Sequence, residues 1–250
     1  MATITDWLIL RGLAREQGHW GEFPSALAAT LGARVHTLDL PGAGDRRGTT
    51  CPPSIAGIVG DLRERWRPLA SAGTRWGLLG ISLGGMVAME WGARHPGDFG
   101  AVVLANTSAR NTSAPWRRMR PTAVLRVLRA LAESDPLTRE RLVLAATTRL
   151  HPALPAVAER WAAIAALRPM RRANVLRQLL AAMRFSAPPT LVPPVLVLSG
   201  GADPLTHPSC PAALAKRFTA PLHVHPDAGH DLSLDAPEWM AATIHQWLSG

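Results

Sequence analysis

The stretch Gly80-Ile81-Ser82-Leu83-Gly84-Gly85 joins an apolar run to a helical pattern that starts at Leu83. It contains a G-x-S-x-G match, which arises by chance in about one chain of this length in ten. The context is more specific, because a strand, a sharp turn and a helix follow one another with small residues where backbones must approach. Such a turn holds serine in a strained conformation with its hydroxyl exposed at the helix N-terminus. The N–H of Leu83 can then point at a developing oxyanion.

Six short apolar runs, each followed by turn residues, are typical of strands buried on both faces. They are Asp6–Leu10, Arg34–Leu38, Arg75–Gly80, Ala101–Ala105, Val195–Ser199 and Leu222–His225. Helical patterns lie between them at Trp20–Leu31, Ser54–Ala70, Leu83–His95, Pro208–Phe218 and Pro237–Leu248. Strands that alternate with helices require crossover connections. We therefore expect one parallel sheet in the spatial order 2-1-3-4-5-6, counted along the chain.

The alternation stops between the fourth and fifth runs, where residues 106–194 contain no strand pattern. This segment is rich in Ala, Leu and Arg at helical spacing, as in Leu142–Thr148. Prolines divide it into several helices; they are Pro121, Pro136, Pro152, Pro155 and Pro169. We expect a helical cap of residues 111–188 on a core of residues 1–110 and 189–250. In open α/β sheets, ligands bind beyond the carboxyl ends of the strands, where such a cap would lie.

A carboxylate and a histidine follow the last two predicted strands. Asp203 lies in the turn after the fifth strand, and His230 lies in the turn after the sixth. A serine hydroxyl is a poor nucleophile without a base and a group that orients the base. The spacing of Asp203 and His230 accommodates one helix and one strand, so both side chains return to the same edge of the sheet. The chain order Ser82, Asp203, His230 is the order expected for a nucleophile on a strand–turn–helix elbow.

Together these pieces resemble the α/β-hydrolase superfamily over nearly the whole chain. The matching pieces are Leu8–Leu13, Asp39–Gly44 and the loops of Ser82, Asp203 and His230. The resemblance implies a mostly parallel, six-stranded α/β-hydrolase sheet with a helical cap inserted between its fourth and fifth strands. The family's N-terminal pair of antiparallel strands is expected to be lacking, because the first predicted strand begins near residue 6.

The resemblance also implies roles for individual residues. Ser82 would be the nucleophile, His230 the general base and acid, and Asp203 the carboxylate that orients the histidine. The backbone amides of Leu13 and Leu83 would form the oxyanion hole. The chain departs from the family at Arg11-Gly12, where the family often has His-Gly, so contacts around the oxyanion hole are expected to differ.

Other side chains are candidates for the substrate pocket. Gly12 lies in the predicted oxyanion loop, and His19 and Trp20 follow it; lining the pocket and packing are equally good readings for this pair. In the cap, we expect an apolar lining that includes Trp116, Leu125, Leu128 and Trp161, with most arginines facing outward.

Some residues fit structural roles better than chemical ones. His223 and His225 alternate onto one strand face, but no third metal ligand is evident, and we predict no metal and no cofactor. Asp227 and Asp231 are alternative acids that do not stand at the end of the preceding strand. Cys51 and Cys210 fit buried small residues, and Asp39 and Asp45 fit hydrogen-bonded turn residues.

Composition and charge exclude several classes of protein. Apolar residues make up 47% of the 250 residues and charged residues 18%, which excludes a disordered chain. Two cysteines exclude a disulfide scaffold, and no apolar run reaches membrane-spanning length. The first residues do not form a signal-peptide pattern, so a cytoplasmic protein is expected. The segment from Arg110 to Arg184 contains 15 arginines and four acidic residues, so it is strongly basic.

The leading hypothesis is a serine hydrolase that cleaves a small carboxylic ester through an acyl-enzyme on Ser82. An alternative keeps the same residues but takes a thioester, a lactone or a methyl ester on an acyl-carrier protein. The basic cap favours an acidic carrier or an anionic substrate, although a solvated helical surface also explains it. A non-catalytic hydrolase-fold binding module is disfavoured by the intact triad. Nucleic-acid binding is disfavoured because no recognised motif accompanies the arginines. A serine at position 82 disfavours dehalogenase chemistry, which uses an aspartate nucleophile.

Overall fold

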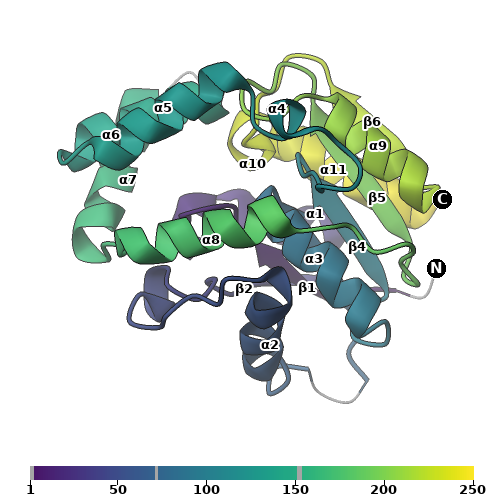
Figure 1. The fold of residues 1–250 in the computed structure, drawn as a ribbon. Helices are drawn as coiled ribbons and strands as arrows, with labels where there is room; N and C mark the ends of the chain where they lie inside the picture. Colours follow the sequence, from purple (N-terminus) through teal and green to yellow (C-terminus); the bar gives the residue numbers. More distant parts are fainter. Residues whose placement is uncertain (1–2, 71–72, 151–153) are drawn as a thin grey trace.

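The structure is a computed structural model that describes residues 3–70, 73–150 and 154–250. Within these ranges one sheet is formed by parallel strands in the order β2-β1-β3-β4-β5-β6 (Figure 1). The strands are β1 (Asp6–Leu10), β2 (Arg34–Thr37), β3 (Trp76–Ile81), β4 (Ala101–Ala105), β5 (Val195–Gly200) and β6 (Leu222–His225). The predicted strands, their parallel pairing and their spatial order are confirmed.

The four central strands, β1, β3, β4 and β5, are buried on both faces because their residues are almost all apolar. The expectation of burial on both faces is wrong for the edge strands β2 and β6, which alternate apolar with polar residues and are partly exposed. In β1, Leu8 and Leu10 join the cluster packed under α2 (Ile55–Trp66), α3 (Leu83–Arg94) and α9 (Ser209–Phe218). Trp7 and Ile9 join the opposite cluster, under α1 (Phe23–Leu31) and α11 (Pro237–Ser249). Two further short helices, η1 (Gln17–Trp20) and α10 (Leu232–Asp235), lie in loops at the carboxyl end of the sheet, and η2 (Gly44–Arg46) follows β2. The sheet is therefore a rigid platform whose carboxyl-end loops are free to carry chemistry.

The segment between β4 and β5 is helical, as the sequence predicts. Its helices are α4 (Pro115–Arg118), α5 (Pro121–Ala132), α6 (Pro136–Thr147), α7 (Leu154–Leu167) and α8 (Arg172–Arg184). Proline opens α4, α5 and α6, because its fixed φ and missing N–H suit the first turn of a helix. Pro152 lies outside the described residues. Figure 1 shows α5, α6 and α7 grouped to one side, while α8 returns alongside α3. We refer to residues 111–188 as the insertion.

The insertion has a small core of its own, in which Leu144, Val157 and Trp161 are buried together. Its arginines mostly face outward, which confirms the prediction: nine of its 14 arginines are exposed. Across the described ranges no helix is both long and apolar enough to cross a membrane.

Candidate active site

Ser82 occupies the sharp turn between β3 and α3. Its backbone has φ 56° and ψ −115°, a conformation that a non-glycine residue adopts only under strain. Glycine at position 84 allows the turn to close, because a Cβ there would lie 2.7 Å from the carbonyl oxygen of Arg11. The Ser82 N–H donates to Ala105 O (2.9 Å), and Thr107 Oγ1 donates to Ser82 O (2.7 Å). The serine is thereby fixed at the carboxyl edge of the sheet while its side chain stays partly exposed.

His230 and Asp203 meet at the same edge, from the loops after β6 and β5. His230 Nδ1 lies 2.7 Å from Asp203 Oδ2, and both side chains are almost fully buried. The other oxygen of Asp203 accepts the N–H groups of Leu205 (2.7 Å) and Thr206 (2.9 Å). The carboxylate is thus held in place, and Nδ1 is the donor to it. His230 Nε2 is buried without a hydrogen-bond partner among the described residues, which leaves it free to accept a proton.

The structure joins two of the three predicted triad residues by a hydrogen bond and places the third on a neighbouring turn. No hydrogen bond links Ser82 Oγ to His230 Nε2 within the described ranges. Catalytic hydrogen bonds are often long without substrate, so the lack of this bond does not exclude a nucleophile and its base.

Asn106 links the end of β5 to the His230 loop, while its neighbours Ala105 and Thr107 bind the backbone of Ser82; the sequence reasoning missed it. Its side chain is 1% exposed, its φ is 45°, and its Oδ1 accepts the N–H of Gly200 (2.8 Å). Its Nδ2 donates to the carbonyl oxygens of Gly229 (3.0 Å) and His230 (2.8 Å). The neighbouring Thr107 binds Ser82 O. The signal available in the sequence was an asparagine directly after a fully apolar strand, where asparagine tolerates a left-handed backbone.

The predicted oxyanion loop lies against the serine. A Cβ on Gly12 would be 3.3 Å from Ser82 Cβ and 3.8 Å from its Oγ. Within the described part of the chain, the N–H groups of Leu13 and Leu83 bond no acceptor outside their own turn or helix. The next amide, of Ala14, donates to Gln178 Oε1 on α8 (3.0 Å), and Gln178 is fully buried. The insertion therefore supports the loop that carries Leu13.

His19, Trp20 and Trp161 are buried at the junction of this loop and the insertion. The ring of His19 meets that of Trp161 edge-on at 5.1 Å, and the Arg15 guanidinium lies 5.1 Å from the Trp161 ring centre. Burial lowers the pKa of His19 well below its usual value, and the nearby charges of Arg15 and Arg11 lower it further. Trp20 stacks on Phe23. Packing accounts for these contacts, and a role in the pocket stays a prediction.

The remaining pocket candidates, Trp116, Leu125 and Leu128, are on the surface of the insertion. Their exposed fractions are 65%, 61% and 56%, compared with 1% for Trp161. Their role in lining a pocket also stays a prediction.

Arg15 also pairs with Glu140 on α6 at 2.6 Å, a contact between the predicted oxyanion loop and the insertion that sequence reasoning did not anticipate.

The residues assigned structural roles behave accordingly. Asp39 accepts the N–H groups of Gln17 (2.7 Å) and Asp45 (2.9 Å), which confirms a turn-stabilising role. Burial raises the pKa of Cys51 to about 11 and also raises that of Cys210, so neither thiol is activated. Among the described residues no cluster of three or more His, Cys, Asp or Glu side chains could hold a metal.

The sequence model of the alpha/beta hydrolase family matches residues 8–243, which is most of the chain and includes all three loops. The chain belongs to this family. Its fold is also similar to that of the enol-lactonase from Burkholderia xenovorans LB400, with a TM-score of 0.76 and 21% identity over 98% of this chain and 92% of that one. At that identity, the likeness concerns the fold alone.

Two curated relatives are pimeloyl-[acyl-carrier protein] methyl ester esterases. The protein from Chromobacterium violaceum is 37% identical over 94 residues, which are 37% of this chain and 34% of that protein. The protein from Edwardsiella ictaluri is 30% identical over 139 residues, which are 55% of this chain and 50% of that protein. The matches therefore span half or less of each relative's length.

Proposed function

We propose that this protein is a serine hydrolase that cleaves carboxylic esters through an acyl-enzyme on Ser82. The observation that carries the proposal is the buried His230–Asp203 pair of 2.7 Å with a free Nε2, beside a serine on a strained turn. An orienting carboxylate, an imidazole with an unoccupied basic nitrogen and an exposed hydroxyl are the components that acyl transfer needs. The esterase names of the two curated relatives agree with this reaction class.

In the proposed mechanism, Ser82 Oγ attacks the carbonyl carbon while its proton passes to His230 Nε2. The oxyanion of the tetrahedral intermediate accepts hydrogen bonds from the Leu13 and Leu83 N–H groups. The intermediate collapses to the acyl-enzyme, and the departing alkoxide takes the proton from His230. Water then attacks the acyl carbon, gives a proton to His230 and releases the acid, and that proton returns to Ser82. Asp203 stays ionised and keeps Nδ1 as the proton-bearing nitrogen.

We further propose that the insertion is a cap over this site. The supporting contacts all reach the oxyanion loop: Gln178 accepts from Ala14, Glu140 pairs with Arg15, and Trp161 packs on His19. A second hydrogen-bonded residue of α8, Asn174, holds the loop after β2 by accepting from Cys51 N (2.9 Å) and donating to Thr49 O (3.0 Å). Helices bound to these loops are positioned to exclude water from the reacting groups.

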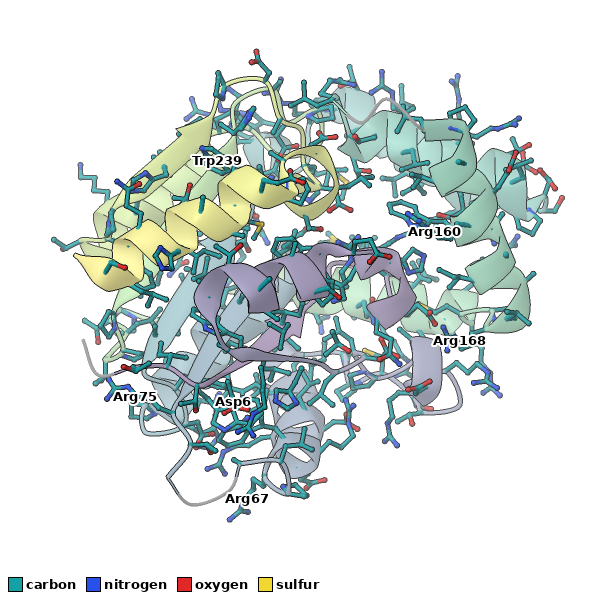
Figure 2. The ribbon with its side chains drawn as sticks, turned by 180° about the vertical axis from the view of Figure 1, so that it is seen from behind. Asp6, Arg67, Arg75, Arg160, Arg168 and Trp239 are labelled. Carbon is teal, nitrogen blue, oxygen red and sulfur yellow. The ribbon has the colours of Figure 1, made fainter. Side chains whose placement is uncertain are left out.

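A substrate presented on an acidic acyl carrier is a second candidate, because nine exposed arginines lie on the insertion. Figure 2 labels two arginines of this segment, Arg160 and the partly buried Arg168. The two curated relatives are named for a carrier-bound methyl ester. A surface of this kind attracts an anionic partner over a long range, and salt weakens that attraction.

The deciding experiment compares kcat/KM for p-nitrophenyl esters of increasing acyl length with matching acyl-CoA and carrier-bound methyl-ester substrates. Ester hydrolysis by the wild type and its loss in Ser82→Ala support the proposed reaction, while retained turnover in Ser82→Ala would exclude Ser82 as the nucleophile. Repeating the assays at low salt and at about 0.5 M salt, where screening acts within a few ångströms, tests the carrier. If the substrate is presented on an acidic carrier, salt should lower kcat/KM for the carrier-bound substrate alone. Equal effects of salt on the carrier-bound and the carrier-free substrates would exclude the carrier.

A further inference from the structure

A second buried charge pair lies next to the proposed triad. The guanidinium of Arg11 is bidentate to Asp231, with Nη1–Oδ1 at 3.1 Å and Nη2–Oδ2 at 2.6 Å. Nη1 also donates to Ser233 Oγ (2.9 Å), and that hydroxyl donates to Asp231 Oδ1 (2.7 Å). The guanidinium carbon lies 4.7 Å from the ring centre of Trp20. Both charged side chains are nearly inaccessible to water.

The pair joins the two loops whose relative position matters most for acyl transfer. Arg11 directly precedes Gly12, which lies against Ser82, and the Arg11 carbonyl packs on the first turn of α3. Asp231 directly follows His230, and its N–H donates to Thr147 O at the end of α6 (2.9 Å). A shift of either side chain would therefore change the separation between the oxyanion loop and the base.

Stability alone does not explain why two charges are buried here. Replacing a buried ion pair by apolar groups of similar volume is often neutral or stabilising, whereas removing one partner leaves an uncompensated charge. Burial by itself raises the pKa of Asp231, but the charge and hydrogen bonds of Arg11 and the hydroxyl of Ser233 outweigh it, and the pKa lies below its usual value. The residue beside His230 is therefore a carboxylate, and Arg11 is the cation bound to it.

We propose that Arg11 and Asp231 are positioning residues, which fix the oxyanion loop relative to His230 and balance the charge next to the base. This inference rests on the proposed function, since it assigns the pair to the activation of Ser82. At Arg11-Gly12, where contacts around the oxyanion hole are expected to differ from the family's, Arg11 supplies a permanent cation to the carboxylate that follows His230.

The two single substitutions have opposite expected effects on the pH profile. Arg11→Gln leaves the Asp231 carboxylate unbalanced beside the base, which favours the protonated base and moves the acid limb of activity to higher pH. Asp231→Asn leaves the Arg11 cation unbalanced, which disfavours protonation and moves the acid limb to lower pH. Other charged or titratable groups around this site are Arg15, Asp203, the buried His19 and Asp235, which accepts the N–H of Gly229 (2.7 Å), and all of them are unchanged in both variants. A nearby charge shifts such a limb by about one pH unit or more.

The experiment follows the labelling rate of Ser82 by a fluorophosphonate between pH 5 and 9 in the full-length protein, with the labelled residue identified by mass. Labelling needs an activated serine but no knowledge of the natural substrate. We expect both single variants to label about 10- to 100-fold more slowly, as for a small misplacement of reacting groups, with limbs shifted in opposite directions. Arg11→Lys should recover part of the rate and keep the wild-type limb.

Two further variants separate positioning from folding. The charge-free pair Arg11→Met with Asp231→Leu should fold, label slowly and keep a limb near that of the wild type. Arg34→Gln breaks another bidentate Arg–Asp pair, whose arginine is exposed and whose Asp6 lies at the amino end of β1 (Figure 2), and should label like the wild type. If the wild type labels at Ser82 but the folded single variants keep its rate and limb, the positioning role is wrong. If the wild type does not label at Ser82, the proposed function itself fails and this inference with it.

Discussion

Replacing Asn106 provides the most direct test of how the loops of the proposed catalytic residues are held together. Asn106→Ala removes the acceptor for Gly200 N and the donor to the carbonyl oxygens of Gly229 and His230. Each buried group that loses its partner costs about 1–3 kcal/mol. The φ of 45° adds about 1 kcal/mol for alanine in the left-handed region. With three such groups at the lower end of this range and the backbone strain, we expect a loss of at least about 4 kcal/mol in the free energy of unfolding.

Asn106→Gly separates the two contributions, because glycine loses the same hydrogen bonds without the backbone strain. It should be about 1 kcal/mol more stable than Asn106→Ala. The matched control is Asn111→Ala. Asn111 also bridges backbone groups with its amide, donating to Ala187 O (2.9 Å) and accepting from Ala187 N (2.8 Å), but it is exposed. Ala187 is buried, but its carbonyl oxygen keeps a hydrogen bond from Arg217 Nη2 (3.2 Å), so only its N–H loses its partner and we expect a loss of about 1–2 kcal/mol.

Urea denaturation followed by tryptophan fluorescence measures these differences, since the chain has nine tryptophans. Asn106→Gly should also lower kcat for a p-nitrophenyl ester by about tenfold or more with little change in KM, because the loops of Asp203 and His230 lose their common support. A loss of stability in Asn106→Ala no larger than in Asn111→Ala would refute the reasoning. So would wild-type kcat in a folded Asn106→Gly variant.

Three other predictions follow from the same structure. Ser82→Ala should abolish ester hydrolysis while changing the unfolding free energy by less than about 1 kcal/mol, which an esterase assay and a urea titration can check. Asp203→Asn should lower kcat in the same esterase assay by several orders of magnitude. Gly84→Ala should destabilise the fold by about 1–3 kcal/mol and reduce activity, because its methyl group would collide with the backbone after β1; an unchanged denaturation midpoint would contradict this. The pKa of His19 in the folded protein lies below its unfolded value near 6.5, so its stabilising contribution is present above pH 6.5 and is lost as the pH falls. Between pH 6.5 and 5.5 the free energy of unfolding should therefore fall by about 1 kcal/mol more in the wild type than in His19→Gln. An equal dependence of the unfolding free energy on pH in the two proteins would disprove the burial argument.

The sequence determines the sheet and the identity of the candidate catalytic residues because their signals are local. The four central strands are short, mainly apolar runs followed by turn residues, and strands that alternate with helices favour parallel pairing. The strained serine is encoded by the glycines around it. Asp203 and His230 are recognisable because each directly follows a strand, and strand ends meet at one edge of the sheet. The hydrogen bond between them therefore lies where the chain order predicts it.

Only the tertiary structure decided which partners the remaining side chains have. Arg11 and Asp231 are 220 residues apart, and nothing local in either segment indicates that they form one buried pair. The apolar residues of the insertion show the same limit: Trp161 is buried, whereas Trp116, Leu125 and Leu128 are exposed. Helical periodicity shows which face of a helix is apolar, but what covers that face depends on how the helices pack on one another and on the loops beneath them. Packing of that kind is a property of the whole chain, so these contacts had to be read from the fold.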